Sequence, residues 1–149
     1  MKRFFQSILF AAMIIALSSC EKLGKDGDWD PVELDKNNIE FPTDGGQVTV
    51  TALNYTSWWI NGGYESETEV NGKLEYSNYV HATSSSGNGA NTHDVLDGGW
   101  YRASVPIYEK GKGNTIIITV DPNNDTKPRT AVIEMQNGDA FTKINISQR

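Results

Sequence analysis

The sequence predicts an all-β domain, an immunoglobulin-like antiparallel β-sandwich of about seven strands with an inserted hairpin or loop region. Short runs that alternate between apolar and polar residues are separated by glycine, asparagine and aspartate turn signals. After the N-terminal leader, no apolar stripe with a 3.6-residue period reaches helical length. The chain after that leader has the size of one small domain. A closed barrel is the alternative arrangement of the same strands.

The first strands are predicted around three runs. Residues 39–41 precede a turn at residues 44–46, and residues 47–53 then alternate with valine and alanine on one face. Residues 58–60 form the next run. Its alternation points two side chains into the core and Trp59 to the opposite face.

The last strands carry the clearest pattern. Residues 115–120 are dense in β-branched side chains. Residues 131–135 alternate and lead into Asn137-Gly138, a strong signal for a two-residue hairpin turn. Residues 141–146 return from that turn with isoleucines on the inward face.

Residues 61–99 do not fit this regular spacing and are interpreted as an insertion. Asn71-Gly72 lies between two short β-type runs and predicts an extra hairpin. Residues 84–91 are rich in serine, glycine and asparagine, which is typical of a mobile loop. Because long loops on a rigid sandwich often carry binding residues, we expect function in this segment. The alternative is that the insertion packs into the core.

The N-terminus has the features of a lipoprotein signal peptide. Lys2 and Arg3 precede an apolar stretch at residues 4–17, which is shorter than the ~20 residues that a membrane span needs. Leu17-Ser18-Ser19 then places small residues directly before Cys20, the only cysteine in the chain. We expect cleavage before Cys20 and lipidation of its thiol, with an ordinary secretory signal as the alternative. A single cysteine excludes a disulfide within the chain.

The predicted organisation follows from these signals. Residues 1–19 are the signal peptide, residues 20–31 carry the lipid and a flexible tether, and residues 32–149 form the sandwich with its insertion at 61–99. We therefore expect a protein anchored in the cell envelope through lipid on Cys20, at the outer membrane and on the cell surface.

The charge argues against a nucleic-acid partner. The full chain has a formal net charge of −6, and removal of the two basic residues in the leader makes it more acidic. Nucleic-acid binding needs clustered lysine and arginine. The acidic character fits a soluble surface domain.

No catalytic or metal-binding pattern stands out, so we expect neither an enzyme nor a cofactor. His93, Asp94 and Asp97 could in principle hydrolyse a substrate or bind a metal, but they lie in the glycine-rich stretch that is least suited to fixing charge. Asp121-x-Asn123-x-Asp125 starts like a calcium loop but lacks its glycine and its distal glutamate. We interpret it as a turn.

The chain resembles the BACON domain family, immunoglobulin-like sandwiches associated with carbohydrate binding in gut and related bacteria. The resemblance covers roughly residues 31–60 and 100–149. It rests on Ile39-x-Phe41 before Gly45-Gly46, Val48-x-Val50, Asn54 ahead of Trp58, the run at 113–116, Asn123 with Arg129, Ala131-x-Ile133, and the ending Ile144-x-Ile146-x-Gln148. The resemblance implies the sandwich fold, a buried tryptophan at Trp58 and a binding function.

Aromatic side chains in and beside the insertion are the best candidates for ligand contact: Trp59, Tyr64, Tyr76, Tyr79 and Tyr101. Sugar rings present apolar C–H faces that stack on such rings, and neighbouring amides and carboxylates can bond the hydroxyls. The alternative is that these rings form a satellite core. For Trp100 we favour the core.

Together these features predict a non-enzymatic, lipid-anchored binding module of the cell envelope, with a polysaccharide as the leading ligand. The alternative is a structural or interaction lipoprotein that docks another envelope protein or acts as a spacer. In that case the same aromatics would form a protein interface.

Overall fold

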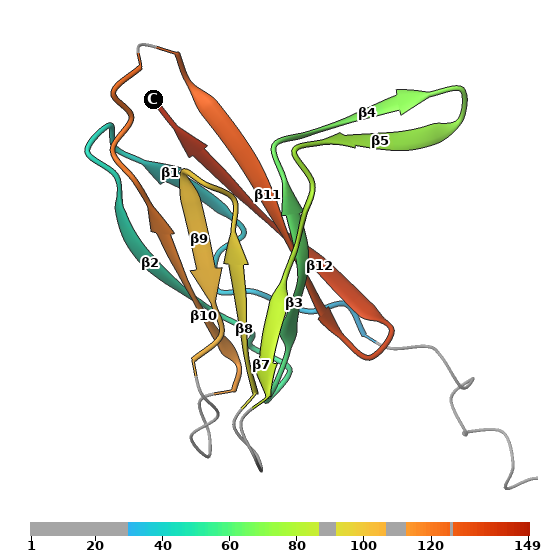
Figure 1. Ribbon diagram of the computed structural model, residues 1–149. Helices are drawn as coiled ribbons and strands as arrows, with labels where there is room; N and C mark the ends of the chain where they lie inside the picture. Colours follow the sequence, from blue (N-terminus) through green and yellow to red (C-terminus); the bar gives the residue numbers. More distant parts are fainter. Residues whose placement is uncertain (1–29, 87–91, 107–112, 126) are drawn as a thin grey trace, which may run out of the picture.

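The computed structural model describes residues 30–86, 92–106, 113–125 and 127–149, and these residues form an all-β sandwich (Figure 1). The predicted fold class is therefore confirmed. The predicted signal peptide, Cys20 and most of the tether lie outside the described residues. None of the described segments is a helix with the length and apolar character that crossing a bilayer requires.

The first sheet has five strands in the order β1-β12-β11-β3-β6. Their bounds are β1 Asn38–Phe41, β12 Ala140–Gln148, β11 Arg129–Asn137, β3 Trp59–Tyr64 and β6 Val80–His81. β1 pairs with β12 in parallel, whereas the other neighbours are antiparallel. The prediction of a purely antiparallel sandwich is wrong at this edge, because the first strand lies beside the last one and runs in the same direction.

The second sheet is antiparallel throughout and has the order β2-β10-β9-β8-β7. Its strands are β2 Gly46–Thr51, β10 Thr115–Val120, β9 Tyr101–Ser104, β8 Thr92–Asp97 and β7 Thr83–Ser86. A separate hairpin of β4 Ser66–Val70 and β5 Lys73–Ser77 projects from the end of β3, away from both sheets (Figure 1).

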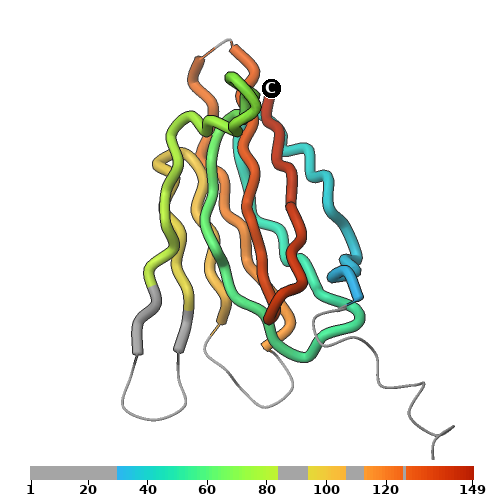
Figure 2. Tube along the Cα trace, turned by 90° about the vertical axis from the view of Figure 1, so that its right-hand side faces the viewer, coloured from blue at the N-terminus to red at the C-terminus, as the bar shows by residue number. Residues whose placement is uncertain are grey.

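Most of the predicted insertion belongs to the sandwich. Seven strands start outside it, as predicted, but β6, β7 and β8 add to the edges of both sheets and run along one side of the molecule (Figure 2). Leu96 of β8 is 0% exposed and belongs to the core. The expectation that residues 61–99 form a loop region outside the sandwich is therefore correct only for the β4–β5 hairpin. Its Asn71-Gly72 turn is confirmed, with both residues at positive φ.

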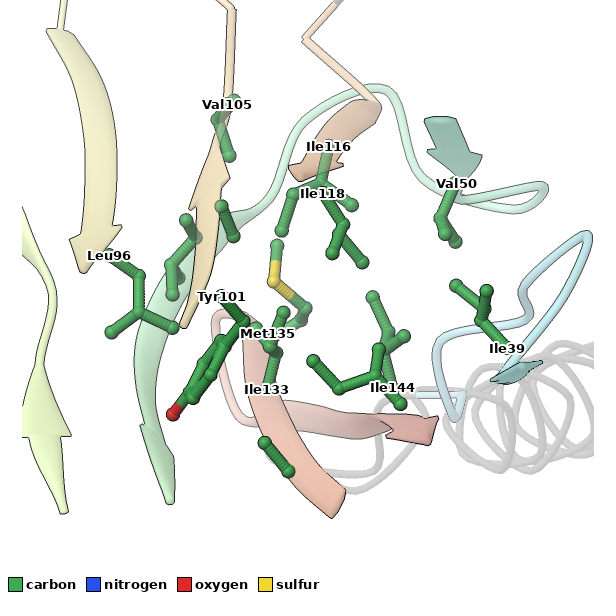
Figure 3. Packing of buried hydrophobic residues seen from close by; sticks show 14 of the residues in the cluster. Ile39, Val50, Leu96, Tyr101, Val105, Ile116, Ile118, Ile133, Met135 and Ile144 are labelled. Carbon is green, nitrogen blue, oxygen red and sulfur yellow. The ribbon is translucent and has the colours of Figure 1, made fainter. Parts of the chain in front are cut away.

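The core lies between the two sheets and follows the predicted alternation. Ile133, Met135 and Ile144 of the first sheet face Ile116 and Ile118 of the second (Figure 3). All five are 0% exposed.

The segment with the tryptophan pair, in which Trp58 directly precedes β3, also has the predicted orientation. Trp58 and Ile60 are buried, and Trp59 between them is 41% exposed. The two inward side chains therefore contribute to the core, and the ring between them is left on the outer face.

A buried amide joins the chain segments at one end of the sandwich. Gln148 is 1% exposed, and its Nε2 donates to the carbonyl oxygens of Pro42 at 2.9 Å and Asp121 at 3.0 Å. Its Oε1 accepts from Nε of Arg129 at 2.8 Å. Gly45 turns the chain close by, at φ +77°, where a Cβ would lie 2.2 Å from a backbone oxygen of β10.

This arrangement predicts opposite outcomes for two deletions. The first deletion removes residues 67–70 and 73–76 and keeps Asn71-Gly72. Because Ser66 pairs with Ser77, the shortened hairpin keeps the same turn, and its remaining side chains keep their faces. This deletion should lower the free energy of unfolding by no more than about 2 kcal/mol, because Tyr64 loses part of its cover. Replacing residues 62–98 with a short linker should abolish cooperative unfolding, because β6 to β8 and Leu96 are lost. Denaturant melts followed by tryptophan fluorescence check both outcomes, and equal stability of the two variants would contradict the fold.

Candidate functional site

Two exposed aromatic rings lie in one row on the outer face of the first sheet, the face turned toward the viewer in Figure 2. Gln136 of β11 pairs with Trp59 of β3 on one side and with Phe141 of β12 on the other. Residues directly opposite in a ladder point to the same face. Trp59 is 41% exposed and Phe141 is 58% exposed. In the next rung of the ladder, Ile60 and its partner Met135 point inward and are buried.

Polar groups lie directly beside this aromatic row. Asn61 is the extra residue of a β-bulge opposite β11, and its Nδ2 donates to Oε2 of Glu134 at 3.3 Å. Glu134 pairs with Lys143 of β12 in the next register row. With Phe141 and Thr142, these three side chains line a shallow hollow of about 370 Å³. The surface therefore combines two apolar rings with an amide and a carboxylate that can bond hydroxyl groups.

A cluster of tyrosines continues the outer face toward the hairpin. Ring centroids are 4.7 Å apart for Tyr64 and Tyr76, 5.7 Å for Tyr76 and Tyr79, and 4.9 Å for Tyr79 and His81. Gly62 lies under this cluster, and a Cβ there would lie 2.5 Å from the Tyr79 hydroxyl. The glycine therefore lets the Tyr79 ring lie against the sheet, where burial raises the pKa of Tyr79.

One carboxylate holds the base of the hairpin against the sheet. Oε2 of Glu67, on β4, accepts from the Tyr64 hydroxyl at 2.8 Å and from Nζ of Lys143 at 2.8 Å. These hydrogen bonds, the one from Lys143 being the larger effect, keep the pKa of Glu67 below its usual value, and the same contact raises the pKa of Lys143. Burial raises the pKa of Tyr64 to about 12, so its hydroxyl stays a donor at neutral pH.

The predicted ligand residues separate into three groups. Trp59 and Tyr76 are exposed, and Tyr79 is half-buried on the same outer face. Tyr64 is 0% exposed and supports the rings of Tyr76 and Tyr79 from below, so we remove it from the ligand-contacting set. Tyr101 is 1% exposed with its ring in the core, and its assignment to ligand contact is also corrected.

Phe141 was not among the predicted ligand residues, although a signal for it exists in the sequence. Phe141 has the opposite parity to Ile144 and Ile146 along β12, which places its ring on the outer face. Only the pairing with β11 and β3 aligns it with Trp59, and neither sequence segment contains that information.

The Trp100 side chain is held by contacts within the protein. Its indole Nε1 donates to Oε1 of Glu65 at 2.8 Å, and the guanidinium carbon of Arg129 lies 4.4 Å from the ring centroid. The ring packs partly buried against the core, which agrees with the favoured interpretation.

Among the residues considered for metal binding, Asp94, Asn123 and Asp125 have structural contacts, whereas the side chain of His93 lies outside the described part of the chain. Asp94 is 8% exposed, and its Oδ2 accepts the backbone N–H of Ile60 at 3.0 Å. The backbone N–H of Asp125 donates to Oδ1 of Asn123 at 3.2 Å, which is the predicted side-chain turn. Within the described ranges, no group of three or more histidine, cysteine or acidic side chains is placed to hold a metal ion.

Comparisons with known proteins agree with this architecture. The family model described as "BACON: Putative binding domain, N-terminal" matches residues 74–149. An NMR structure of a protein from Bacteroides thetaiotaomicron is similar, with 23% identity and a TM-score of 0.52 over 87% of this chain and 95% of that protein. This likeness shows the fold.

A second solved structure is a Bacteroides ovatus GH5 xyloglucanase in complex with a XXXG heptasaccharide. It has 23% identity and a TM-score of 0.43, and the match covers 78% of this chain and 18% of the enzyme. No curated protein sequence matches the chain.

The Glu67 contact predicts that the hairpin loosens in acid. A carboxyl with a lowered pKa stabilises the folded state above its usual value of 4.5, and that contribution is lost as the pH falls through the lowered pKa. The ¹⁵N heteronuclear NOEs of residues 66–77 should therefore fall below that pH. Glu67→Gln should give low NOEs at neutral pH already, and Glu69→Gln, on the same strand and face, should behave as the wild type. Unchanged NOEs through the acid range would contradict the anchoring role.

Proposed function

The chain belongs to the BACON family, and we propose that it is a non-enzymatic, lipid-anchored binding module of the cell envelope whose ligand is a glycan. The observation that carries the proposal is the outer face of the first sheet, where exposed Trp59 and Phe141 lie beside Asn61 and Glu134. Stacking of sugar C–H faces on the two rings would supply affinity, and the polar pair would bond hydroxyls. Contacts of this kind are individually weak, so many anchored copies on one surface would add avidity.

The anchor completes the proposed module. The apolar leader and the small residues before Cys20 support cleavage and lipidation there. Lipid on Cys20 would hold the sandwich at the outer membrane, with the domain on the cell surface, through a polar tether that lets the outer face reach its ligand.

A protein partner is the second candidate, because the projecting hairpin carries exposed apolar side chains. Leu74 is 53% exposed and Val70 is 39% exposed, on opposite faces of a hairpin that only its base connects to the sheet. A projecting hairpin with apolar side chains on both faces suits a protein interface at least as well as a sugar. The two candidates therefore use different parts of the molecule, and variants can separate them.

The glycan proposal predicts that the aromatic row is needed for polysaccharide retention. Trp59→Ala and Phe141→Ala should each weaken binding by about 1–3 kcal/mol, by analogy with base–aromatic stacking. The measurement is depletion of full-length protein, kept in a zwitterionic rather than a glycosidic detergent, by a panel of immobilised polysaccharides. Leu53→Ala, which removes a side chain 63% exposed beyond the end of β2, is the matched control. If only Leu74→Ala abolishes an interaction, and the partner captured is a protein, the second candidate replaces the first.

The anchor proposal predicts that Cys20→Ala changes the fate of the protein. Without a thiol to lipidate, the protein should leave the membrane fraction or accumulate as the uncleaved precursor. The reason is that stable anchoring needs several acyl chains, at ~0.8 kcal/mol per buried CH₂. Fractionation after a high-salt wash, with an immunoblot for size, measures both results. A mutant that is processed to the mature size and still sediments with the membrane would exclude lipidation at Cys20.

A further inference from the structure

The two exposed rings of the outer face are separated by a distance that the strand register sets. Trp59 on β3 and Phe141 on β12 each pair directly with Gln136 on β11, the strand that lies between them. Neighbouring strands are 4.7–4.9 Å apart, which places the two ring-bearing positions about 10 Å apart on a line across the strands. This separation is close to the length of two pyranose residues in an extended chain.

The alignment favours a ligand that is straight over this distance. Equatorial β-1,4 linkages produce a flat ribbon in which alternate residues recur at a regular spacing, whereas α-1,4 linkages curve the chain. A ribbon that crosses β12, β11 and β3 could place one residue on each ring. Gln136 lies between the two ring-bearing residues in the ladder, and its Nε2 donates to the Gly138 carbonyl oxygen at 2.8 Å. Asn61 and Glu134 lie in the adjoining row. The middle residue of the ribbon would therefore meet hydrogen-bonding groups.

The charges beside the row favour an uncharged ligand. Glu134 contributes a carboxylate to the hollow beside Phe141. Lys143, which lines the same hollow, has its ammonium group 2.8 Å from Glu67 and is therefore already paired. A uronic-acid or sulfated polysaccharide would approach the carboxylate without a free positive partner, which costs binding energy.

We propose that the ligand is an uncharged, extended, β-linked glycan that lies across β12, β11 and β3, with residues stacked on Trp59 and Phe141. This inference rests on the proposed function and deepens it. The competing path runs along β3 toward the hairpin, over Tyr79 and Tyr76, and would leave Phe141 without a role.

Calorimetric titration of the full-length protein with cello-oligosaccharides distinguishes these paths. Affinity should rise by about tenfold or more from cellobiose to cellotetraose, because only the longer ligand reaches both rings, and then level off. Trp59→Ala and Phe141→Ala should each weaken cellotetraose binding by about fivefold or more, and Phe141→Trp should retain it. Leu53→Ala should match the wild type, and Tyr76→Ala, on the competing path, should weaken binding less than either aromatic-row variant. Thermal melts of each variant check that the fold is intact.

The ligand class has its own matched comparisons. Maltotetraose, the α-linked isomer, should bind more weakly than cellotetraose. The cellouronate tetramer, which carries a carboxylate on every residue, should bind weakly to the wild type and more tightly to Glu134→Gln.

Each contrary result overturns a defined part of the inference. Weakening by Trp59→Ala and Tyr76→Ala, with no effect of Phe141→Ala, overturns the path across the strands while glycan binding stands. Equal affinity for maltotetraose, or a preference for cellouronate, overturns the ligand class. Retention on the polysaccharide panel without binding of any cello-oligosaccharide also overturns the class. If the panel retains no protein, the proposed function itself fails.

Discussion

The buried amide of Gln148 is the contact on which closure of the sandwich depends. Its Nε2 bonds carbonyl oxygens from the turn after β1 and from the segment after β10, and its Oε1 accepts from Arg129 at the start of β11. The Gln148 side chain is itself buried, and leaving its amide unpaired would cost ~1–3 kcal/mol, so its bonds tie the segment after β1 of the first sheet to the segment after β10 of the second. This geometry gives a physical reason for the glutamine at the end of the sequence pattern that resembles the family.

Local alternation was enough to predict the strands whose two faces differ strongly. Residues 115–120 and the orientation of Trp59 follow from one side of the strand being apolar, and Asn71-Gly72 forms a turn because its backbone favours positive φ. β6 and β7 were not predicted because they are edge strands with few apolar residues, and β8, which lies between β7 and β9, has Leu96 as its one buried apolar side chain among the described ones. β8 pairs with its neighbours in sequence, β7 and β9, but the polar Asp94 is buried on the same side as Leu96, so no apolar alternation marks the strand.

The candidate site could likewise be predicted only in part from the sequence. Sequence composition located aromatic residues in the right region, but exposure depends on what covers each ring. Tyr64 lies on the outer face and is nevertheless buried, because the hairpin folds Tyr76 over it. Tyr101 lies against the core side of Gly63, where the absence of a Cβ makes room for its hydroxyl. Phe141 gained its place beside Trp59 only through the register of three strands.

The parallel pairing of β1 with β12 has a mechanical consequence. β1 follows the N-terminal tether, and β12 carries Phe141 on the outer face. A pull between the tether and a ligand held at Phe141 would act on the two strands from the same end, because Phe141 precedes Asn145, the partner of Asn38, along β12. That load would open the ladder bond by bond from Asn38–Asn145, whereas a force on the C-terminal end of β12 would load all of its hydrogen bonds together in shear. The position of the bound ligand along β12 therefore sets how much tension this edge of the sheet resists.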